Sequence, residues 1–169
     1  QASSRGEMSL MRDSPYRFLI IEDNFGDVRL IQEMLSEDSD GTFLLDSAER
    51  LSKGLAAIAE EPPDLVILDL NLPDSRGLET VKRLIGEAGG LPIVVLTAIN
   101  DKSLAMEAVQ EGAQDYLVKG EIQGRLLWRT ILHAIERKRI GEKLRCSEQK
   151  LKEAQALGKI GSWEFDLAS

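Results

Sequence analysis

Several side chains able to support phosphate chemistry stand at the ends of short apolar runs. In chain order these are Glu22-Asp23, Asp69, Thr97 and Lys119. Carboxylates that share one crevice repel one another, so their pKa values rise or a cation joins them. A site with only oxygen ligands suits Mg²⁺, which takes further ligands from water and phosphate. The residue types therefore predict a magnesium-assisted phosphoryl-transfer site.

Asp69 is the candidate nucleophile of this set. It is expected to lie deepest, at the end of the central strand, and a carboxylate can accept a phosphoryl group to form an aspartyl phosphate. Phosphoryl transfer needs mainly positioning and neutralisation of charge. Lys119 offers a positive point charge for the phosphate, and the Thr97 hydroxyl can donate to a phosphoryl oxygen.

A predicted sheet brings these distant residues together. Five apolar runs alternate with helical patterns, and they lie at Phe18–Ile21, Phe43–Leu45, Leu65–Leu68, Ile93–Leu96 and Tyr116–Val118. Strict alternation predicts an α/β fold, a doubly wound parallel five-stranded sheet over residues 16–137. Ligands of such sheets bind at the carboxyl ends of the strands. The fold is therefore expected to gather the acids, the hydroxyl and the lysine at one edge.

Composition narrows the class of protein. The 169 residues carry a net charge of −8, which disfavours direct nucleic-acid binding and an anionic membrane surface. The lone Cys146 excludes an internal disulfide and suits a reducing compartment. No apolar run approaches the roughly 20 residues of a membrane span, and residues 1–15 predict a flexible leader without a signal peptide. We therefore expect a cytoplasmic protein.

Four segments closely resemble bacterial response-regulator receiver domains. They are Ile21-Glu22-Asp23-Asn24, Asp64-Leu65-Val66-Ile67-Leu68-Asp69-Leu70-Asn71-Leu72-Pro73, Leu96-Thr97-Ala98 and Asp115-Tyr116-Leu117-Val118-Lys119. The resemblance covers residues 16–140 and implies a flavodoxin-like (βα)5 fold. It also implies transfer of a phosphoryl group from a histidine kinase or phosphotransfer protein onto Asp69.

The same resemblance implies roles for individual residues. Asp23 and Asp69 would bind Mg²⁺ through their side chains and Asn71 through its backbone carbonyl, while Glu22 would hold metal-bound water. Thr97 and Tyr116 match the switch pair of the family, in which the hydroxyl moves to the phosphate and the aromatic ring turns inward. Asp69, Thr97 and Lys119 would be the catalytic groups.

One position departs from the family pattern. Proline with a cis bond usually follows the lysine, whereas Gly120 follows Lys119 here. A cis bond before a residue other than proline costs about 2.5–4 kcal/mol, which leaves the trans form open. The phosphoryl lifetime cannot be derived from Asn71 and Ile99, which occupy positions where family members differ.

The C-terminal part predicts a helical linker over residues 138–157. Ile140, Leu144 and Leu151 lie near heptad positions, so the linker is either a solvated extension or a helix that pairs with its copy in a homodimer. Residues 158–169 resemble the start of a PAS domain, and the alternation of Trp163, Phe165 and Leu167 predicts a strand there. This would imply a longer protein, such as a hybrid histidine kinase or a cyclic-dinucleotide enzyme.

Other functions fit the same residues less well. An aspartate-nucleophile phosphatase usually carries an acid two residues after the nucleophile, where this chain has Asn71. A flavodoxin-type electron carrier would need phosphate donors after the first strand, where residues 24–27 end in an acid. A degenerate receiver that acts only as a protein-interaction module remains the alternative. The expected receiver catalyses its own phosphorylation and dephosphorylation but is not by itself a turnover enzyme.

Overall fold

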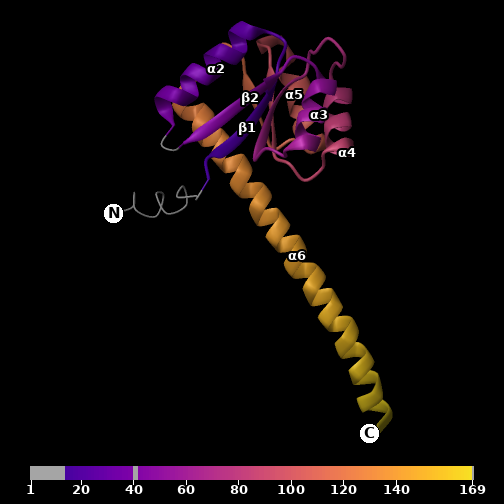
Figure 1. The fold of residues 1–169 in the computed structure, drawn as a ribbon. Helices are drawn as coiled ribbons and strands as arrows, with labels where there is room; N and C mark the ends of the chain where they lie inside the picture. The colour runs from indigo at the N-terminus through magenta and orange to yellow at the C-terminus, as the bar shows by residue number, and fades with distance from the viewer. Residues whose placement is uncertain (1–13, 40–41, 169) are drawn as a thin grey trace. The chain divides into compact units, whose positions relative to one another are not determined.

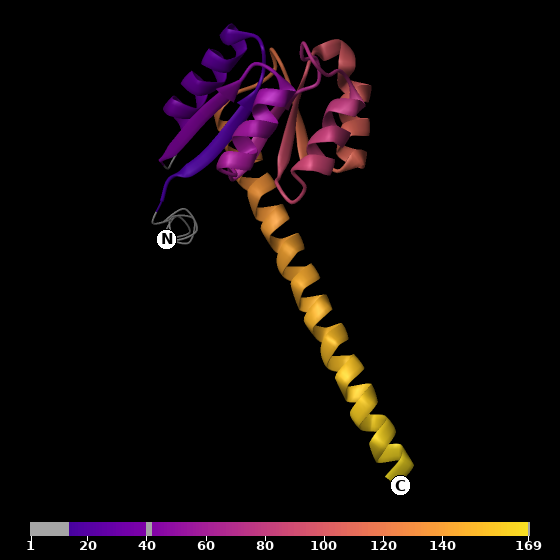
Figure 2. The same cartoon turned by 45° about the vertical axis from the view of Figure 1, so that its right-hand side comes forward.

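A single parallel sheet forms the centre of the fold. The computed structural model describes residues 14–39 and 42–168. Its strands are β1 (Tyr16–Ile21), β2 (Phe43–Ala48), β3 (Leu65–Asp69), β4 (Ile93–Thr97) and β5 (Asp115–Val118). They are arranged in the order β2-β1-β3-β4-β5. β1 and β2 run side by side in Figure 1, and Figure 2 gives the same fold turned by 45°. The strand order reverses between β1 and β3, which puts the expected ligand crevice at their carboxyl ends.

Helical segments alternate with the strands, so the predicted doubly wound (βα)5 arrangement is confirmed. The segments are α2 (Phe25–Asp38), α3 (Leu51–Glu60), α4 (Leu78–Glu87), the short 3-10 helix η1 (Ile99–Asp101), α5 (Lys102–Glu111) and α6 (Gly124–Ala168). Asn24 starts α2 immediately after the acidic pair, since its side chain accepts hydrogen bonds from Gly26 N–H at 2.9 Å and Asp27 N–H at 3.2 Å.

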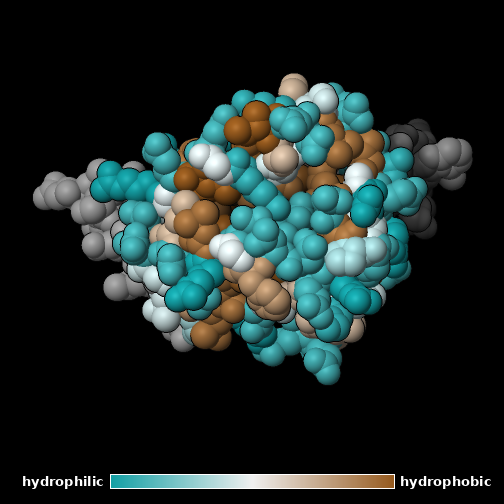
Figure 3. All heavy atoms as spheres, turned by 90° about the horizontal axis from the view of Figure 1, so that it is seen from above, coloured by the Kyte–Doolittle hydropathy of each residue, from teal (hydrophilic) through white to brown (hydrophobic). Residues whose placement is uncertain are grey.

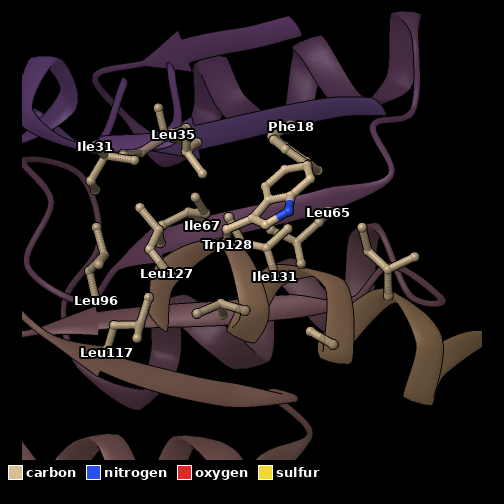
Figure 4. Packing of buried hydrophobic residues seen from close by; sticks show 14 of the residues in the cluster. Phe18, Ile31, Leu35, Leu65, Ile67, Leu96, Leu117, Leu127, Trp128 and Ile131 are labelled. Carbon is tan, nitrogen blue, oxygen red and sulfur yellow. The ribbon is translucent and has the colours of Figure 1, made fainter. Parts of the chain in front are cut away.

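Each central strand is buried on both faces, which explains its continuous apolar run. Phe18 and Ile20 of β1 point into one cluster, with residues of α2 and of the first turns of α6 (Figure 4). Leu19 and Ile21 belong to a second cluster, with residues of α3, α4 and α5. Successive side chains of a strand point to opposite faces, so a strand covered by helices on both sides needs apolar residues at every position.

The C-terminal residues differ from one expectation. The alternating residues Trp163, Phe165 and Leu167 predicted a strand, but the structure continues α6 to Ala168. A strand needs a neighbouring strand for its backbone hydrogen bonds, whereas a helix satisfies most of them within itself. The predicted strand is therefore wrong, whereas the start of a PAS domain at residues 158–169 stays a prediction.

Contacts between residues divide the chain into two compact units. One unit ends at Ile135 and the other begins at Glu136. The five-stranded sheet and every residue of the expected site belong to the first unit. None of the helices in the described ranges is long and apolar enough to cross a bilayer.

Candidate functional site

A cavity of about 290 Å³ opens at the carboxyl ends of the central strands. It is lined by Glu22, Asp23, Asn24, Asp69, Leu70, Asn71, Thr97, Ala98, Asp101, Leu104 and Lys119. Figure 3 looks onto this end of the molecule and shows hydrophilic residues interrupted by separate hydrophobic patches. All the residues predicted to act in catalysis or metal binding are therefore brought together, although they are distant in the sequence.

Three carboxylates form the acidic part of the cavity. One oxygen from each of Glu22, Asp23 and Asp69 lies within 4.8 Å of the others. Glu22 is only 3% exposed and Asp69 only 5%, whereas Asp23 is exposed. Burial, together with a hydrogen bond to Asp69, raises the pKa of Glu22 to about 8. Near neutral pH the cluster therefore carries less than its full negative charge, and a cation would favour the ionised form of Glu22.

Lys119 supplies the positive charge of the site. Its Nζ lies 2.6 Å from Glu22 Oε2, 3.2 Å from Asp69 Oδ2 and 3.1 Å from Asp27 Oδ2. Burial alone lowers the pKa of Lys119, but the neighbouring carboxylates outweigh burial and raise the pKa above its ordinary value. The ammonium therefore stays charged at neutral pH and is fixed beside Asp69.

Backbone N–H groups orient the two buried acids. Asn71 N–H donates to Asp69 Oδ1 at 3.1 Å, and Asn24 N–H donates to Glu22 Oε1 at 3.0 Å. Asp69 thus has one oxygen bound to the following loop and the other beside Lys119. Both carboxylates are held by short-range contacts, so the protein positions them before any ligand binds.

The two predicted switch residues lie in different places. Thr97 is buried and lines the cavity, where its hydroxyl donates to the carbonyls of Asp101 at 3.2 Å and Ala98 at 3.3 Å. Tyr116 is half-buried and lines a different cavity of about 320 Å³, along β5 and the start of α6. The structure therefore brings Thr97, but not Tyr116, to the acidic cavity.

The peptide between Lys119 and Gly120 is trans, since the described residues contain no cis peptide bond. Gly120 has a φ of 88°, a left-handed conformation that glycine adopts without strain. Proline is fixed near −65° and could not adopt this conformation. The loop after β5 is thus built for glycine, and this departure from the family pattern has a local structural reason.

Two acids outside the predicted set of site residues make contacts that bear on the site. Asp27, to which the sequence analysis assigned no role, forms an ion pair with Lys119. Its place in the first turn after the acidic pair was a signal for this contact. Asp74, to which the sequence analysis also assigned no role, accepts hydrogen bonds from the first residues of α3. Its partners are more than twenty residues away, and no local pattern predicts them.

The donor set fits a magnesium ion. Glu22, Asp23 and Asp69 offer hard oxygen ligands, and Asn71 lines the same cavity. No histidine or cysteine is among the lining residues, so a softer metal lacks the ligands it prefers. Lys119 offsets only part of the repulsion among the three carboxylates. A further positive charge in the cavity would therefore be favourable.

Comparison with known proteins agrees with this geometry. Residues 18–130 match the response regulator receiver domain family. The chain is 39% identical over 112 residues to the KDP operon transcriptional regulatory protein KdpE of Escherichia coli, covering 64% of this chain and 48% of that protein. It is 34% identical over 103 residues to the transcriptional regulatory protein PhoP of Escherichia coli, covering 61% of this chain and 45% of that protein. The chain thus matches about half the length of these relatives.

Solved structures show the same fold. A response regulator receiver domain protein from Clostridium thermocellum matches with a TM-score of 0.65 at 26% identity, over 74% of this chain and 98% of that one. The receiver domain of NtrX from Brucella abortus matches with a TM-score of 0.62 at 26% identity, over 70% of this chain and 98% of that one.

Proposed function

This chain belongs to the response regulator receiver domain family, and from that premise we propose that Asp69 is the residue that accepts the phosphoryl group. Its relatives KdpE and PhoP are transcriptional regulatory proteins, and receiver domains take phosphate from histidine kinases. The observation that carries the proposal is the contact between Lys119 Nζ and Asp69 Oδ2 inside the acidic cluster. A buried carboxylate beside a fixed ammonium is a nucleophile with a built-in counter-charge.

The transfer follows from the positions of these groups. A carboxylate oxygen of Asp69 forms a bond to phosphorus while the bond from phosphorus to the imidazole nitrogen of the donor breaks. The electron pair leaves with the imidazole nitrogen. The Lys119 ammonium is placed to neutralise charge on the phosphoryl oxygens, and Asn71 N–H keeps the Asp69 carboxylate oriented. A bound Mg²⁺ would supply the remaining positive charge, held by Asp23, Asp69 and the Asn71 carbonyl, while Glu22 would hold metal-bound water.

Acetyl phosphate and Mg²⁺ provide the direct test. We expect the intact mass of the purified protein to rise by one phosphoryl group, and the gain to disappear when EDTA removes the metal ion. If no gain appears, titration with beryllofluoride separates two cases. Binding of beryllofluoride at Asp69 would show a receiver that needs its own donor, whereas no binding would favour a module that acts only through protein contacts.

We propose that phosphorylation is read out first by Thr97. Its hydroxyl now bonds to the Ala98 and Asp101 carbonyls, and a phosphoryl group on Asp69 would offer a stronger, charged acceptor. Movement of the hydroxyl would release the segment from β4 to α5. A pre-existing equilibrium at this face would then shift, and Tyr116 would turn inward as the second switch residue.

Thr97→Ala is expected to separate phosphorylation from this response. Asp69 and Lys119 remain, so uptake from acetyl phosphate continues at a reduced rate without the Thr97 hydroxyl. The change in hydrogen exchange of residues 98–102 on addition of beryllofluoride is lost. The free energy of unfolding falls by about 1 kcal/mol, because the substitution removes the hydrogen bonds of one neutral hydroxyl group. Thr97→Ser keeps the hydroxyl and is the matched control. An unchanged exchange response in Thr97→Ala would contradict a role for the hydroxyl.

The partners of the domain are part of the proposal. We propose a histidine kinase or a phosphotransfer protein as the donor, the cytoplasm as the location, and no direct contact with nucleic acid. The net charge of −8 supports the last point, because phosphate backbones repel an acidic protein. The output of the full-length protein, including a PAS domain in a hybrid kinase or a cyclic-dinucleotide enzyme, remains a prediction.

We also propose that α6 pairs with its copy in a homodimer. Ile140, Leu144 and Leu151 are each 58% exposed, which leaves these large apolar side chains largely uncovered within one chain. Their heptad spacing would place all three at the seam of a two-stranded coiled coil.

Leu144→Asp is expected to convert a dimer to a monomer, as measured by light scattering over a range of protein concentrations. A charge at a seam position would be buried without a partner. Gln149→Asp introduces the same side chain on the opposite side of the heptad and should leave the mass unchanged. A monomer mass for the wild type at every concentration would contradict the proposed dimer.

A further inference from the structure

The loop between β3 and α4 is closed by its own hydrogen bonds. Leu72 N–H donates to the Ser75 carbonyl at 2.9 Å, and Gly77 N–H donates to the Leu70 carbonyl at 2.7 Å. The loop begins directly after Asp69 and carries Asn71, whose N–H holds the Asp69 carboxylate. The position of this short loop therefore decides how the nucleophile and the neighbouring Asn71 carbonyl are oriented.

The tip of the loop is anchored on a different helix. Asp74 Oδ1 accepts a hydrogen bond from Leu51 N–H at 2.8 Å, and Asp74 Oδ2 accepts one from Ser52 N–H at 2.9 Å. Both donors belong to the first turn of α3. Arg50, which precedes that turn, makes no side-chain hydrogen bond that caps the helix. The cap of α3 is thus supplied by the loop that follows the phosphoacceptor.

Charge favours this anchor. The N-terminus of a helix carries a partial positive charge and free N–H groups, both of which attract a carboxylate. Burial opposes ionisation of Asp74, but the hydrogen bonds from Ser52 and Leu51 together outweigh it and lower the pKa of Asp74 below its ordinary value. Asp74 is therefore ionised at neutral pH, where charge-assisted hydrogen bonds are stronger than neutral ones.

We propose that Asp74 is a positioning residue for phosphotransfer, which fixes the loop carrying Asn71 against α3. This inference rests on the proposed role of Asp69. Asp74 does not line the acidic cavity and so acts through the loop backbone rather than by contact with substrate. Without the anchor, the loop samples more positions, and Asn71 no longer holds its N–H and carbonyl in one place beside Asp69.

A second role for Asp74 would be to cap and stabilise α3 without any effect on the site. The experiment must distinguish this role from positioning of the loop. The test uses Asp74→Ala and the double variant Arg50→Asn/Asp74→Ala. Arg50 has the extended backbone of a helix-capping residue, so asparagine there can cap α3 locally. The double variant restores the helix cap without restoring the link between α3 and the loop. Arg50→Asn alone is the control for the lost positive charge.

Three quantities are measured for each protein: the urea unfolding midpoint, the affinity for Mg²⁺ without phosphodonor, and the rate of phosphorylation by acetyl phosphate. We expect Asp74→Ala to lower the midpoint and to weaken Mg²⁺ binding about 10-fold, as loss of supporting contacts around a metal site typically does. The double variant should recover the midpoint but keep weak Mg²⁺ binding and slow phosphorylation.

Two outcomes would overturn the inference. Recovery of Mg²⁺ affinity together with the midpoint in the double variant would show that Asp74 acts only through the stability of α3. Wild-type Mg²⁺ affinity and rate in Asp74→Ala would show that the anchor has no effect on the site. Mg²⁺ affinity is measured without phosphodonor, so it tests the anchor by itself. Failure of the proposed function would be seen separately, as a wild-type protein that gains no phosphoryl group.

Discussion

Asp69→Asn is expected to take up no phosphoryl group from acetyl phosphate at saturating Mg²⁺. The amide is nearly the same size as the carboxylate but lacks its negative charge, so it is a poor nucleophile. Loss of a nucleophile typically lowers a rate by several orders of magnitude. Glu22 and Asp23 stay in the cavity but should not replace Asp69, because only Asp69 is held by both Asn71 N–H and Lys119. Intact mass spectrometry measures the result.

Asp46→Asn is the matched control for this substitution. Asp46 lies on β2 with its side chain 65% exposed, and it does not line the acidic cavity. The same chemical change there should leave uptake at the wild-type level. Circular dichroism should show that both variants fold. If Asp69→Asn gained a phosphoryl group at the wild-type rate, another residue would be the acceptor, and the proposed mechanism would be wrong.

Trp128→Ala is expected to lower the free energy of unfolding by about 3–5 kcal/mol, the usual cost of replacing a buried large aromatic residue by alanine. Trp128 of α6 is 4% exposed and packs against an aromatic group from β1 and β2. Its ring centroid lies 6.3 Å from that of Tyr16, 6.1 Å from that of Phe18 and 6.4 Å from that of Phe43. The loss is large against the roughly 5–15 kcal/mol that stabilise a typical domain.

Two further variants show whether packing is the cause. Trp128→Phe keeps an aromatic ring and removes an indole N–H that has no hydrogen-bond partner among the described residues, so its cost should stay below about 1.5 kcal/mol. Arg129→Ala changes the exposed neighbour and should alter the free energy by no more than about 0.5 kcal/mol. Urea unfolding followed by circular dichroism compares them. A loss in Trp128→Ala no larger than in Arg129→Ala would mean that the aromatic group contributes little to stability.

The sequence determined the sheet and most of the site. Continuous runs such as Leu65–Leu68 can be satisfied only by strands covered on both faces, and β3 is buried throughout. Because parallel strands all point the same way, the residues that follow them must meet at one edge. Strand order could not change that, so Glu22, Asp23, Asp69, Thr97 and Lys119 were predictable as neighbours.

The local sequence pattern predicted the structure less well at places where the backbone can adopt more than one conformation. Residues 163–167 alternate as a strand would, yet the structure makes them helical, because a strand depends on partners that a pattern cannot supply. The sequence left the peptide between Lys119 and Gly120 open between cis and trans, and the structure has it trans, followed by a glycine with a positive φ.

The contacts among the groups of the site could be known only from the three-dimensional packing. It turned the Thr97 hydroxyl toward backbone carbonyls, placed Tyr116 in a separate cavity, and brought Asp27 to Lys119. It also joined Asp74 to a helix that begins 23 residues earlier in the chain. Side-chain directions and long-range hydrogen bonds depend on how loops pack after the sheet has formed, and the sequence carries no periodic signal for that packing.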